Sequence, residues 1–419
     1  MEEKLIQYVW QLRLFPTDGM KTVDGEDVEV IDQGLLNTNS GPDFFNAKIK
    51  IGGTVWAGNV EIHDVASDWY NHGHDKDVAY DSVVLHVVRV SDERVRRTNG
   101  EVIPQLQIQI PADIEMLYDA NKASKAWIPC AERIGYIDRF TMHLWLDSWL
   151  VQRMETKTSR LKNVLQTTDG DWASVMYVSI ARALGFGTNS QAMEALACAT
   201  PLKYILKHND DIDHVAAMLL GQSSLLSESI IDDESLFSQF TRDYSFYKAK
   251  FGLVPMRREQ WKTGRLRPSN LPWVRIDQLA YILCNATHLI SKFVENPTLD
   301  YMRAQLKDIK AVHFGGLRLG KSSIDSIIIN AIAPILFIYG RSHTDSRLEE
   351  KATAILQEMP AESNSIVEGW RSYGVDASSA FESQALIQLK REYCERKDCL
   401  RCRLFWNMRK GLAAGKEKS

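Results

Sequence analysis

The sequence predicts an α+β protein, with a small N-terminal mixed sheet and its flanking helix followed by a large all-α helical region. Two periodicities in the 419 residues support this. Short β-branched segments with a period of two lie before residue 111, and a period of 3.6 dominates after residue 115. The composition, 45% hydrophobic and 25% charged, is that of chains that bury cores, which excludes long disorder and disulfide miniproteins.

The N-terminal region begins with a predicted helix, because Leu5, Ile6, Val9 and Trp10 form one apolar stripe. The strands that follow are bounded by Gly, Asn, Asp or Pro, and we place them at 27–31, 47–51, 55–63, 82–90 and 106–110. The glycines at 52 and 53 predict a hairpin turn. Residues 83–88 are almost continuously apolar, as in a central strand covered on both faces.

After residue 115, apolar residues at helical spacing predict helices at 139–165, 172–184, 190–199, 211–220, 233–251, 276–293, 300–311, 322–337, 347–357 and 377–394. Two prolines within 265–272 break the pattern. We therefore expect three domains. They are an α/β sheet domain at 1–115 as the candidate metal and catalytic domain, a helical domain at 116–265, and a helical domain at 266–419 with a C-terminal cysteine cluster.

Charge and hydropathy limit the partners and the compartment. A formal net charge of -4 excludes indiscriminate coating of nucleic acid, which depends on neutralising phosphates. Glu2 and Glu3 stand where a signal peptide carries basic residues, and the apolar stretch 327–339 is too short for a span of roughly 20 residues. We expect a cytoplasmic protein that does not enter membranes.

A local basic patch is the candidate nucleic-acid-binding surface. Five cations surround Trp261, namely Arg257, Arg258, Lys262, Arg265 and Arg267. Interleaved cations and aromatic rings can hold a phosphate backbone, so DNA or RNA is the expected partner. A solvated helix face explains the same run equally well.

The strand 55–63 carries the main candidate site. Its period of two places Glu61 and His63 on one face, and the preceding hairpin can bring Asp43 close to Glu61. Two convergent carboxylates can bind Mg²⁺ or Mn²⁺ and activate water at a phosphate. The alternative is a turn at Asp43 and a solvated strand face carrying Glu61 and His63.

Histidines concentrate around this strand. Four of the ten, His63, His72, His74 and His86, lie within residues 63–86, interleaved with aspartates. The pair His72 and His74 could bind Zn²⁺ or Mn²⁺, with His63 and Glu61 completing the ligands. Alternatively His72 and His74 only cap a loop, and His86 alone reads as a buried strand histidine.

The C-terminal region holds a third candidate, Cys394, Cys399 and Cys402 in the segment YCERKDCLRC. Thiolates at such spacing bind zinc or an iron–sulfur cluster, and Cys130 is the best remote fourth ligand. The alternative is three free thiols on a terminal helix.

The order Gly-Pro-Asp43, hairpin, Glu61-x-His63 is similar to the core of the PD-(D/E)XK nucleases. That resemblance implies that Asp43 and Glu61 ligate a metal and that His63 stands at the position of the family's lysine; all three would be catalytic. Glu3 resembles the acidic residue of the first helix in some members. Histidine at the lysine position is a departure, since a neutral imidazole is a poorer phosphate partner.

Several ordered motifs, GPDFFNAKI, WAGNVEIH, RLRPSNLP and the terminal YCERKDCLRC, resemble the bacterial domain-of-unknown-function family 2851 over almost the entire chain. This resemblance implies no activity. The resulting hypothesis is a metal-dependent, nuclease-like phosphodiesterase acting on nucleic acid. The alternative is a catalytically inactive nucleic-acid-binding or scaffold protein with a structural metal site.

Overall fold

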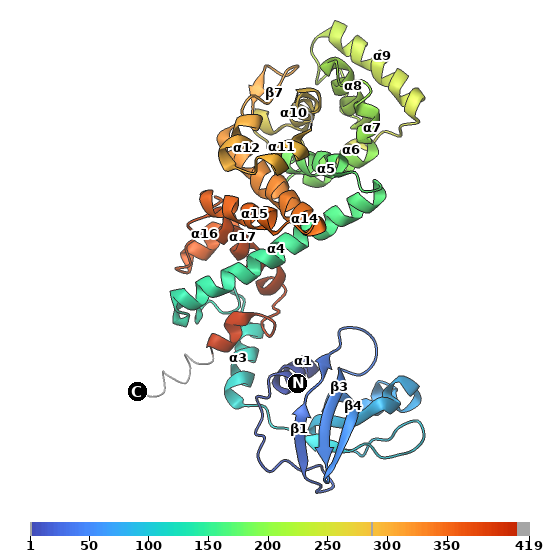
Figure 1. Cartoon of the computed structure of the whole chain (residues 1–419), viewed down its shortest axis with the longest axis vertical. Coiled ribbons are helices and arrows are strands. Elements are labelled where there is room, and N and C mark those ends of the chain that lie inside the picture. The colour runs from blue at the N-terminus through green and yellow to red at the C-terminus, as the bar shows by residue number, and fades with distance from the viewer. Residues whose placement is uncertain (1, 286–287, 409–419) are drawn as a thin grey trace. The chain divides into compact units, whose positions relative to one another are not determined.

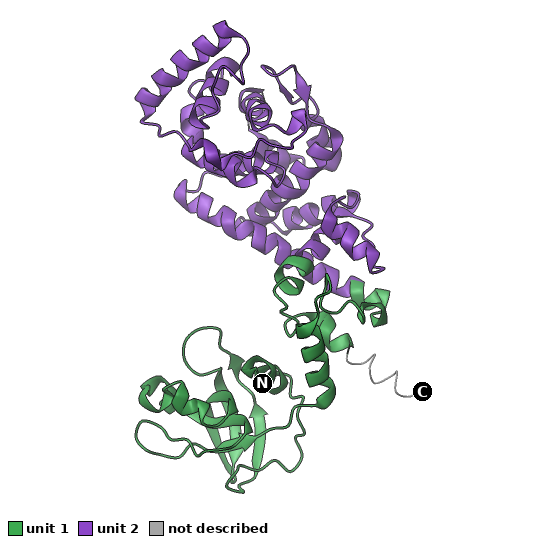
Figure 2. Ribbon diagram, turned by 180° about the vertical axis from the view of Figure 1, so that it is seen from behind, with its two compact units in different colours: residues 1–142, 389–419 green, residues 143–388 purple. Residues whose placement is uncertain are grey.

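The computed structural model describes residues 2–285 and 288–408. The chain forms two compact units: unit 1 comprises residues 1–142 and 389–419, and unit 2 comprises residues 143–388 (Figure 2). These boundaries differ from the expected ones at 115/116 and 265/266. The first unit regains the chain after residue 388, and position 265 lies inside unit 2. The last part of the expected third domain, 409–419, lies outside the described residues.

Unit 1 contains the predicted mixed sheet. Its strands are β1 (Val28–Asp32), β2 (Leu35–Leu36), β3 (Phe44–Ile51), β4 (Thr54–Val65), β5 (Val83–Val90) and β6 (Gln105–Gln107), in the order β1-β3-β4-β5-β6 with β2 beside β3. The pairs β1–β3 and β3–β4 are antiparallel, whereas the pairs β4–β5 and β5–β6 are parallel. The predicted α+β class with an N-terminal mixed sheet is confirmed (Figure 1).

Local irregularities set the register around β4. Asn46 adopts a φ of 57° at the point where the β3–β4 register shifts, and such a bulge redirects the side chains before it. Gly58 is required by close approach, since a Cβ there would lie 2.3 Å from a methyl carbon of Val84 on β5. Because β4 and β5 are parallel, the chain must cross over between them, and this crossover holds α2 (Asp68–Asn71) and the short turns η1 (His74–Lys76) and η2 (Val78–Ser82).

Helices complete unit 1. Helix α1 (Glu3–Gln11) buries Leu5, Ile6, Val9 and Trp10, the stripe that predicted it, and contacts β4. Helix α3 (Ala112–Ala123) was not predicted, because its apolar residues form a weaker stripe. After unit 2 the chain returns as the π-helical turn η7 (Leu389–Cys394).

Unit 2 is helical apart from one short hairpin, β7 (Lys310–Ala311) with β8 (Leu317–Arg318), within the described residues. Helix α4 (Arg139–Thr167) begins in unit 1 and continues into it. The other helices are α5 (Trp172–Leu184), α6 (Ser190–Ala199), α7 (Leu202–Ile205), α8 (Ile212–Gln222), α9 (Glu234–Phe251), α10 (Pro272–Asn285), α11 (Leu289–Glu295), α12 (Leu299–Leu306), α13 (Lys321–Ile327), α14 (Ala333–Ser342), α15 (Ser346–Glu358), α16 (Ser365–Ser372) and α17 (Ala380–Gln388).

Two predicted helices were wrong in extent. The segment 276–293 is not one helix: α10 ends at Asn285, and His288, with a φ of 61°, precedes α11. The segment 300–311 ends as helix at Leu306 and continues into β7, a change too short to alter the apolar periodicity.

Lys321–Ser342 forms a continuous helical run through α13, the π-helical turn η6 (Ile328–Ile332) and α14. Its 22 residues are long and apolar enough to cross a membrane by length and composition, which the 13-residue apolar stretch alone did not indicate. However, 78% of the apolar window is buried within the protein, as expected of a core helix.

A buried polar cluster joins three elements of unit 2. The imidazole of His313, between β7 and β8, contacts Asp277 of α10 through Nδ1 (2.6 Å) and Asp213 of α8 through Nε2 (2.9 Å). Asp277 is fully buried, and the backbone N–H of His313 donates to its second oxygen. Phe240 of α9 covers the ring, and Gln239 donates to Asp213. Burial lowers the pKa of His313, but hydrogen bonds to both carboxylates and their charges outweigh it, so the pKa is raised.

This cluster makes the stability of unit 2 depend on pH. A raised folded pKa stabilises the protein fully below the unfolded pKa of about 6.5, and the contribution disappears as the pH rises through the folded value. We expect His313→Ala to lower the free energy of unfolding by roughly 3 kcal/mol at acidic pH, because it leaves Asp277 buried and unpaired. Urea denaturation at pH values below and above the titration of His313 measures this loss, with the variant His343→Ala at an exposed position as the control. An equal loss for both variants would contradict it.

Candidate metal centre

Strand β4 holds two functional side chains on one face, as its period of two predicts. Glu61 and His63 are 5% and 1% exposed, so the alternative of a solvated strand face is wrong. In the parallel register Glu61 lies opposite His86 of β5, which puts the His86 ring beside that of His63. Trp69 of the crossover packs against His86 and His74 and covers this side of the sheet.

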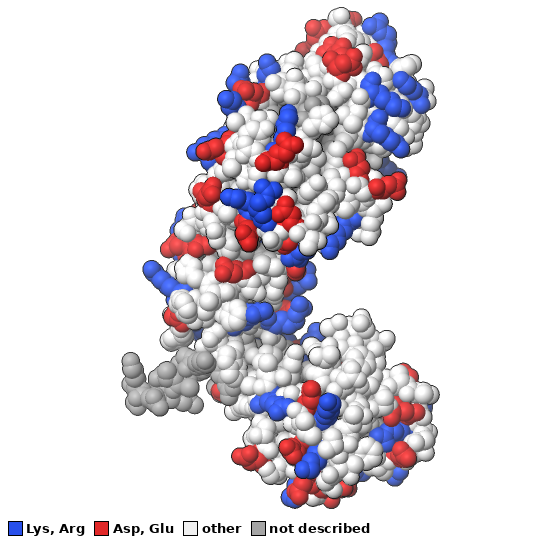
Figure 3. Space-filling view, in the orientation of Figure 1, with Lys and Arg blue, Asp and Glu red and all other residues white. Residues whose placement is uncertain are grey.

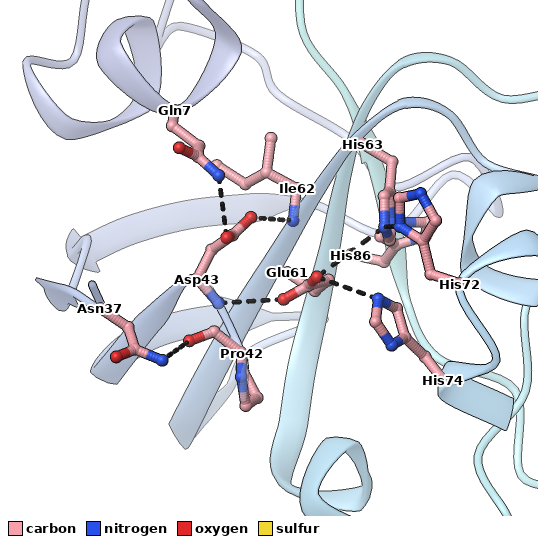
Figure 4. Close-up of polar contacts among 10 residues, drawn as sticks. All are labelled: Gln7, Asn37, Pro42, Asp43, Glu61, Ile62, His63, His72, His74 and His86. Atoms are coloured by element: carbon pink, nitrogen blue, oxygen red, sulfur yellow. Dashed lines mark hydrogen bonds and ion pairs between the residues drawn. The ribbon is translucent and has the colours of Figure 1, made fainter. Parts of the chain in front are cut away.

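Asp43 lies beside Glu61, as the hairpin predicts. Phe44 pairs with Val60 in antiparallel register, so the preceding residue lies opposite Glu61. The backbone N–H of Asp43 donates to Glu61 Oε2 (2.9 Å), after a turn in which Gly41 has a φ of 99°. Its carboxylate accepts from Gln7 Nε2 (2.8 Å) and from the N–H of Ile62 (3.1 Å), and in Figure 4 it points toward these donors and away from the histidines.

The crossover brings two further imidazoles to this face. His72 follows α2 and His74 begins η1, with Gly73 between them at a φ of 75°. His74 Nε2 lies 3.3 Å from Glu61 Oε1, and His72 Nδ1 lies 3.1 Å from His63 Nε2. Tyr80 of η2 stacks on His74 with ring centroids 3.7 Å apart. His74 is buried and His72 is exposed, so the cluster reaches solvent on the side of His72.

The spacing of these atoms fits one metal ion. One ring nitrogen from each of His63, His72 and His74 lies within 4.8 Å of the others, and Glu61 Oε1 is 3.8 Å from His63 Nε2. Ligands about 2.0–2.1 Å from a tetrahedral zinc ion are roughly 3.3–3.4 Å apart. Three imidazoles suit Zn²⁺ or Mn²⁺ better than Mg²⁺, which prefers oxygen ligands.

His86 orients His63. Its Nε2 lies 2.8 Å from His63 Nδ1, so one of these two nitrogens donates and the other accepts. If His63 Nδ1 donates, His63 Nε2 is left with a lone pair that points toward His72. A partner on the second ring nitrogen is the usual arrangement behind a metal-bound histidine. His86 is fully buried, and its Nδ1 has no hydrogen-bond partner among the described residues.

Burial controls the charges of the cluster. It raises the pKa of Glu61 and of Asp43, and for Asp43 the nearby carboxylate of Glu61 adds to the effect. Burial also lowers the pKa of His63 to about 2 and that of His86 to about 3, with repulsion from neighbouring imidazoles adding to it. His63 and His86 are therefore neutral, the form of imidazole that binds metals. Burial raises the pKa of Glu3 on α1, and nearby His72 offsets part of this effect.

The cysteines form a separate cluster in unit 1. Cys130, Cys394, Cys399 and Cys402 line one cavity together with Asn121, Pro129, Tyr393, Phe405 and Met408. All four are free thiols. The remote fourth residue expected from the sequence therefore lies with the other three around this cavity.

The basic patch around Trp261 is only partly as expected. Arg257, Arg258, Lys262, Arg265 and Arg267 are exposed, and none of the five has an ion pair within the described part of the chain. Trp261 is buried and donates from Nε1 to the carbonyl of Ser223 (2.9 Å), so it cannot stack on a base. Elsewhere, cations and acidic residues are interspersed over both units in the view of Figure 3.

Sequence reasoning identified His86 as a buried strand histidine but assigned no supporting role to it, to Gln7 or to Tyr80. Gln7 holds Asp43, His86 holds His63, and Tyr80 covers His74. The run of four histidines was a signal for His86, but its position behind His63 depends on the parallel β4–β5 register. Nothing in the sequence singles out Gln7 or Tyr80.

Comparison with models of known protein families identifies the family of this chain. Residues 3–365 match the family model described as "Protein of unknown function (DUF2851)". The chain belongs to this family. Neither curated proteins nor solved structures gave a match. The expected membership is confirmed, whereas the similarity of this DUF2851 protein to the PD-(D/E)XK core rests on its local pattern.

A ligand variant tests the metal centre. His72 is exposed, so His72→Ala removes one nitrogen without leaving a core cavity. We expect Zn²⁺ or Mn²⁺ affinity to fall by more than the roughly 10–100-fold that follows loss of an outer-shell partner. Isothermal titration of metal-stripped protein measures this, with exposed His343→Ala as the control. Equal affinity in His72→Ala and wild type would contradict the site.

Proposed function

We propose that unit 1 is a metal-dependent phosphodiesterase of nuclease-like type, acting on nucleic acid. The observation that carries the proposal is the convergence of buried Glu61 with three histidines at one exposed edge. A bound Zn²⁺ or Mn²⁺ would activate water and offset the charge that develops on the phosphate. The order Asp43, hairpin, Glu61-x-His63 agrees with a nuclease core.

The chain's own residues would divide the work. His63, His72 and His74 would hold the ion, and His86 orients His63 through their 2.8 Å contact. Glu61 Oε1 faces the same point and could receive a proton from the attacking water. The water oxygen would bond to phosphorus as one P–O ester bond breaks, and the departing oxygen would take a proton from solvent. Asp43 positions Glu61 through its backbone N–H.

The rival function is a structural metal site in a catalytically inactive nucleic-acid-binding or scaffold protein. Burial favours it, because Glu61, His63 and His74 are each less than 9% exposed, as the ligands of a closed structural site would be. Both functions use the same metal ligands, but a catalytic site must leave space beside the exposed His72 for water and substrate. An assay of nucleic-acid cleavage therefore distinguishes them.

Glu61→Gln separates these functions. It keeps the size of the side chain but cannot accept the proton, so we expect Mn²⁺- or Zn²⁺-dependent cleavage of labelled DNA or RNA to fall at least about 100-fold, the scale of general-base catalysis. Glu29→Gln on exposed β1 is the matched control. Cleavage that survives in Glu61→Gln, or is absent from metal-loaded wild type, would refute the phosphodiesterase. Wild-type protein that retains the metal but does not cleave nucleic acid would favour the structural site.

The exposed cations predict a salt-dependent association with nucleic acid. Replacing Arg257, Arg258, Arg265 and Arg267 with Gln removes four positive charges that lack ion pairs in the described chain. Affinity for single-stranded DNA or RNA should fall, and the slope of log K against log salt should shrink by roughly 0.7 for each phosphate that is no longer neutralised. Fluorescence anisotropy over a salt series measures both. An unchanged slope would show that these four arginines do not contact phosphates and only face solvent.

A further inference from the structure

The four cysteines come from two distant parts of the chain. Cys130 precedes unit 2, whereas Cys394, Cys399 and Cys402 follow it, and Cys130 and Cys394 are 264 positions apart. All four nevertheless line one cavity inside unit 1. A group bound there would connect the segment that leaves unit 1 to the segment that returns to it.

The spacing of the sulfur atoms argues against a single zinc ion. Four thiolates about 2.3 Å from zinc are roughly 3.8 Å apart, so any three would lie close together. Among the described residues, the clusters with ligand atoms within 4.8 Å of one another do not include three of these cysteines. The four cysteines line a shared cavity, yet no three of these described residues have sulfur atoms all within 4.8 Å of one another.

We propose that this cavity binds an iron–sulfur cluster, held by Cys130, Cys394, Cys399 and Cys402, which clamps the C-terminal segment to the N-terminal part of unit 1. Such clusters take four cysteine thiolates distributed over several irons, which spreads the sulfurs around a central body. Apolar and aromatic neighbours, Phe405, Met408 and Tyr393, limit access of solvent, which protects such a cluster. The proposal is independent of the phosphodiesterase, because it uses none of its residues.

Other contacts already hold the same segments together. Lys397 Nζ donates to the carbonyls of Lys122 (2.7 Å) and Ser124 (2.9 Å), and Phe405 packs edge-on against Tyr8 of α1. The ammonium of Lys390 lies 4.7 Å from the ring of Trp127. A cluster would add a strong link to these weak contacts, closing a long loop whose ends are otherwise costly to bring together. Its loss should therefore loosen residues 389–408 without unfolding the sheet.

The test uses full-length protein isolated without oxygen and reconstituted with iron and sulfide, or with zinc in parallel. We expect two or four irons and equal acid-labile sulfide per chain, with visible absorbance bleached by reductant. The iron content should fall more than about tenfold in Cys130→Ser and in Cys399→Ser, whereas replacing the exposed Cys198 of α6 with Ser should leave it unchanged. Limited proteolysis should release the C-terminal segment faster from the first two variants.

Several results would overturn the proposal. They are one zinc and no sulfide per chain after iron reconstitution, no bound metal at all, and full iron retention in Cys130→Ser. If Cys130→Ser fails to fold, as judged by circular dichroism, the iron and sulfide content of wild type and its paramagnetic resonance spectrum after reduction decide instead. Iron and sulfide at equal numbers support the cluster, and their absence removes it.

Discussion

The parallel pairing of β4 with β5 is the constraint on which the candidate site depends. Antiparallel neighbours can be joined by two residues, but parallel strands require a chain that crosses over one face of the sheet. Here that crossover carries His72 and His74, and it lays them over the face from which Glu61 and His63 project. The same register places His86 behind His63. A direct hairpin after β4 would leave Glu61 and His63 without these partners.

Burying these polar groups costs folding free energy unless a ligand such as a metal ion binds to them. Glu61, His63 and His74 lie together where each loses hydration, and His86 Nδ1 has no hydrogen-bond partner among the described residues. Burial and the neighbouring imidazoles lower the pKa of His63, so this ring cannot offset the carboxylate by becoming cationic. A divalent cation would satisfy the lone pairs of the three histidines and attract the nearby Glu61 carboxylate. The polar cluster in unit 2 solves a similar problem differently, since His313 there receives a carboxylate on each nitrogen.

The sequence predicted the elements that have a periodic pattern of apolar and polar residues. Period two in β4 put Glu61 and His63 on one face, and the apolar stripe in α1 indicated its buried side. Helices α5 and α6 begin and end where the periodicity changes. Parallel pairing, the role of Gln7 and the return of the C-terminal segment to unit 1 depend on contacts between distant residues, which periodicity does not encode. Periodicity also predicts one helix where the structure has α10 and α11. The break at His288 is a change of backbone conformation, which hydropathy does not record.

Under the proposed function, His63 stands where the nuclease pattern has a lysine, and this changes which group supplies positive charge to the phosphate. A lysine there would bring its own cation to the phosphate, but burial and neighbouring imidazoles keep His63 neutral. Its Nδ1 is also committed to His86, so only Nε2 faces the site. A neutral imidazole with an oriented lone pair is a poor partner for phosphate and a good ligand for a metal. Under the proposed function, the substitution therefore moves the charge from a side chain to the ion, and the extra histidines of the crossover are what make that exchange possible.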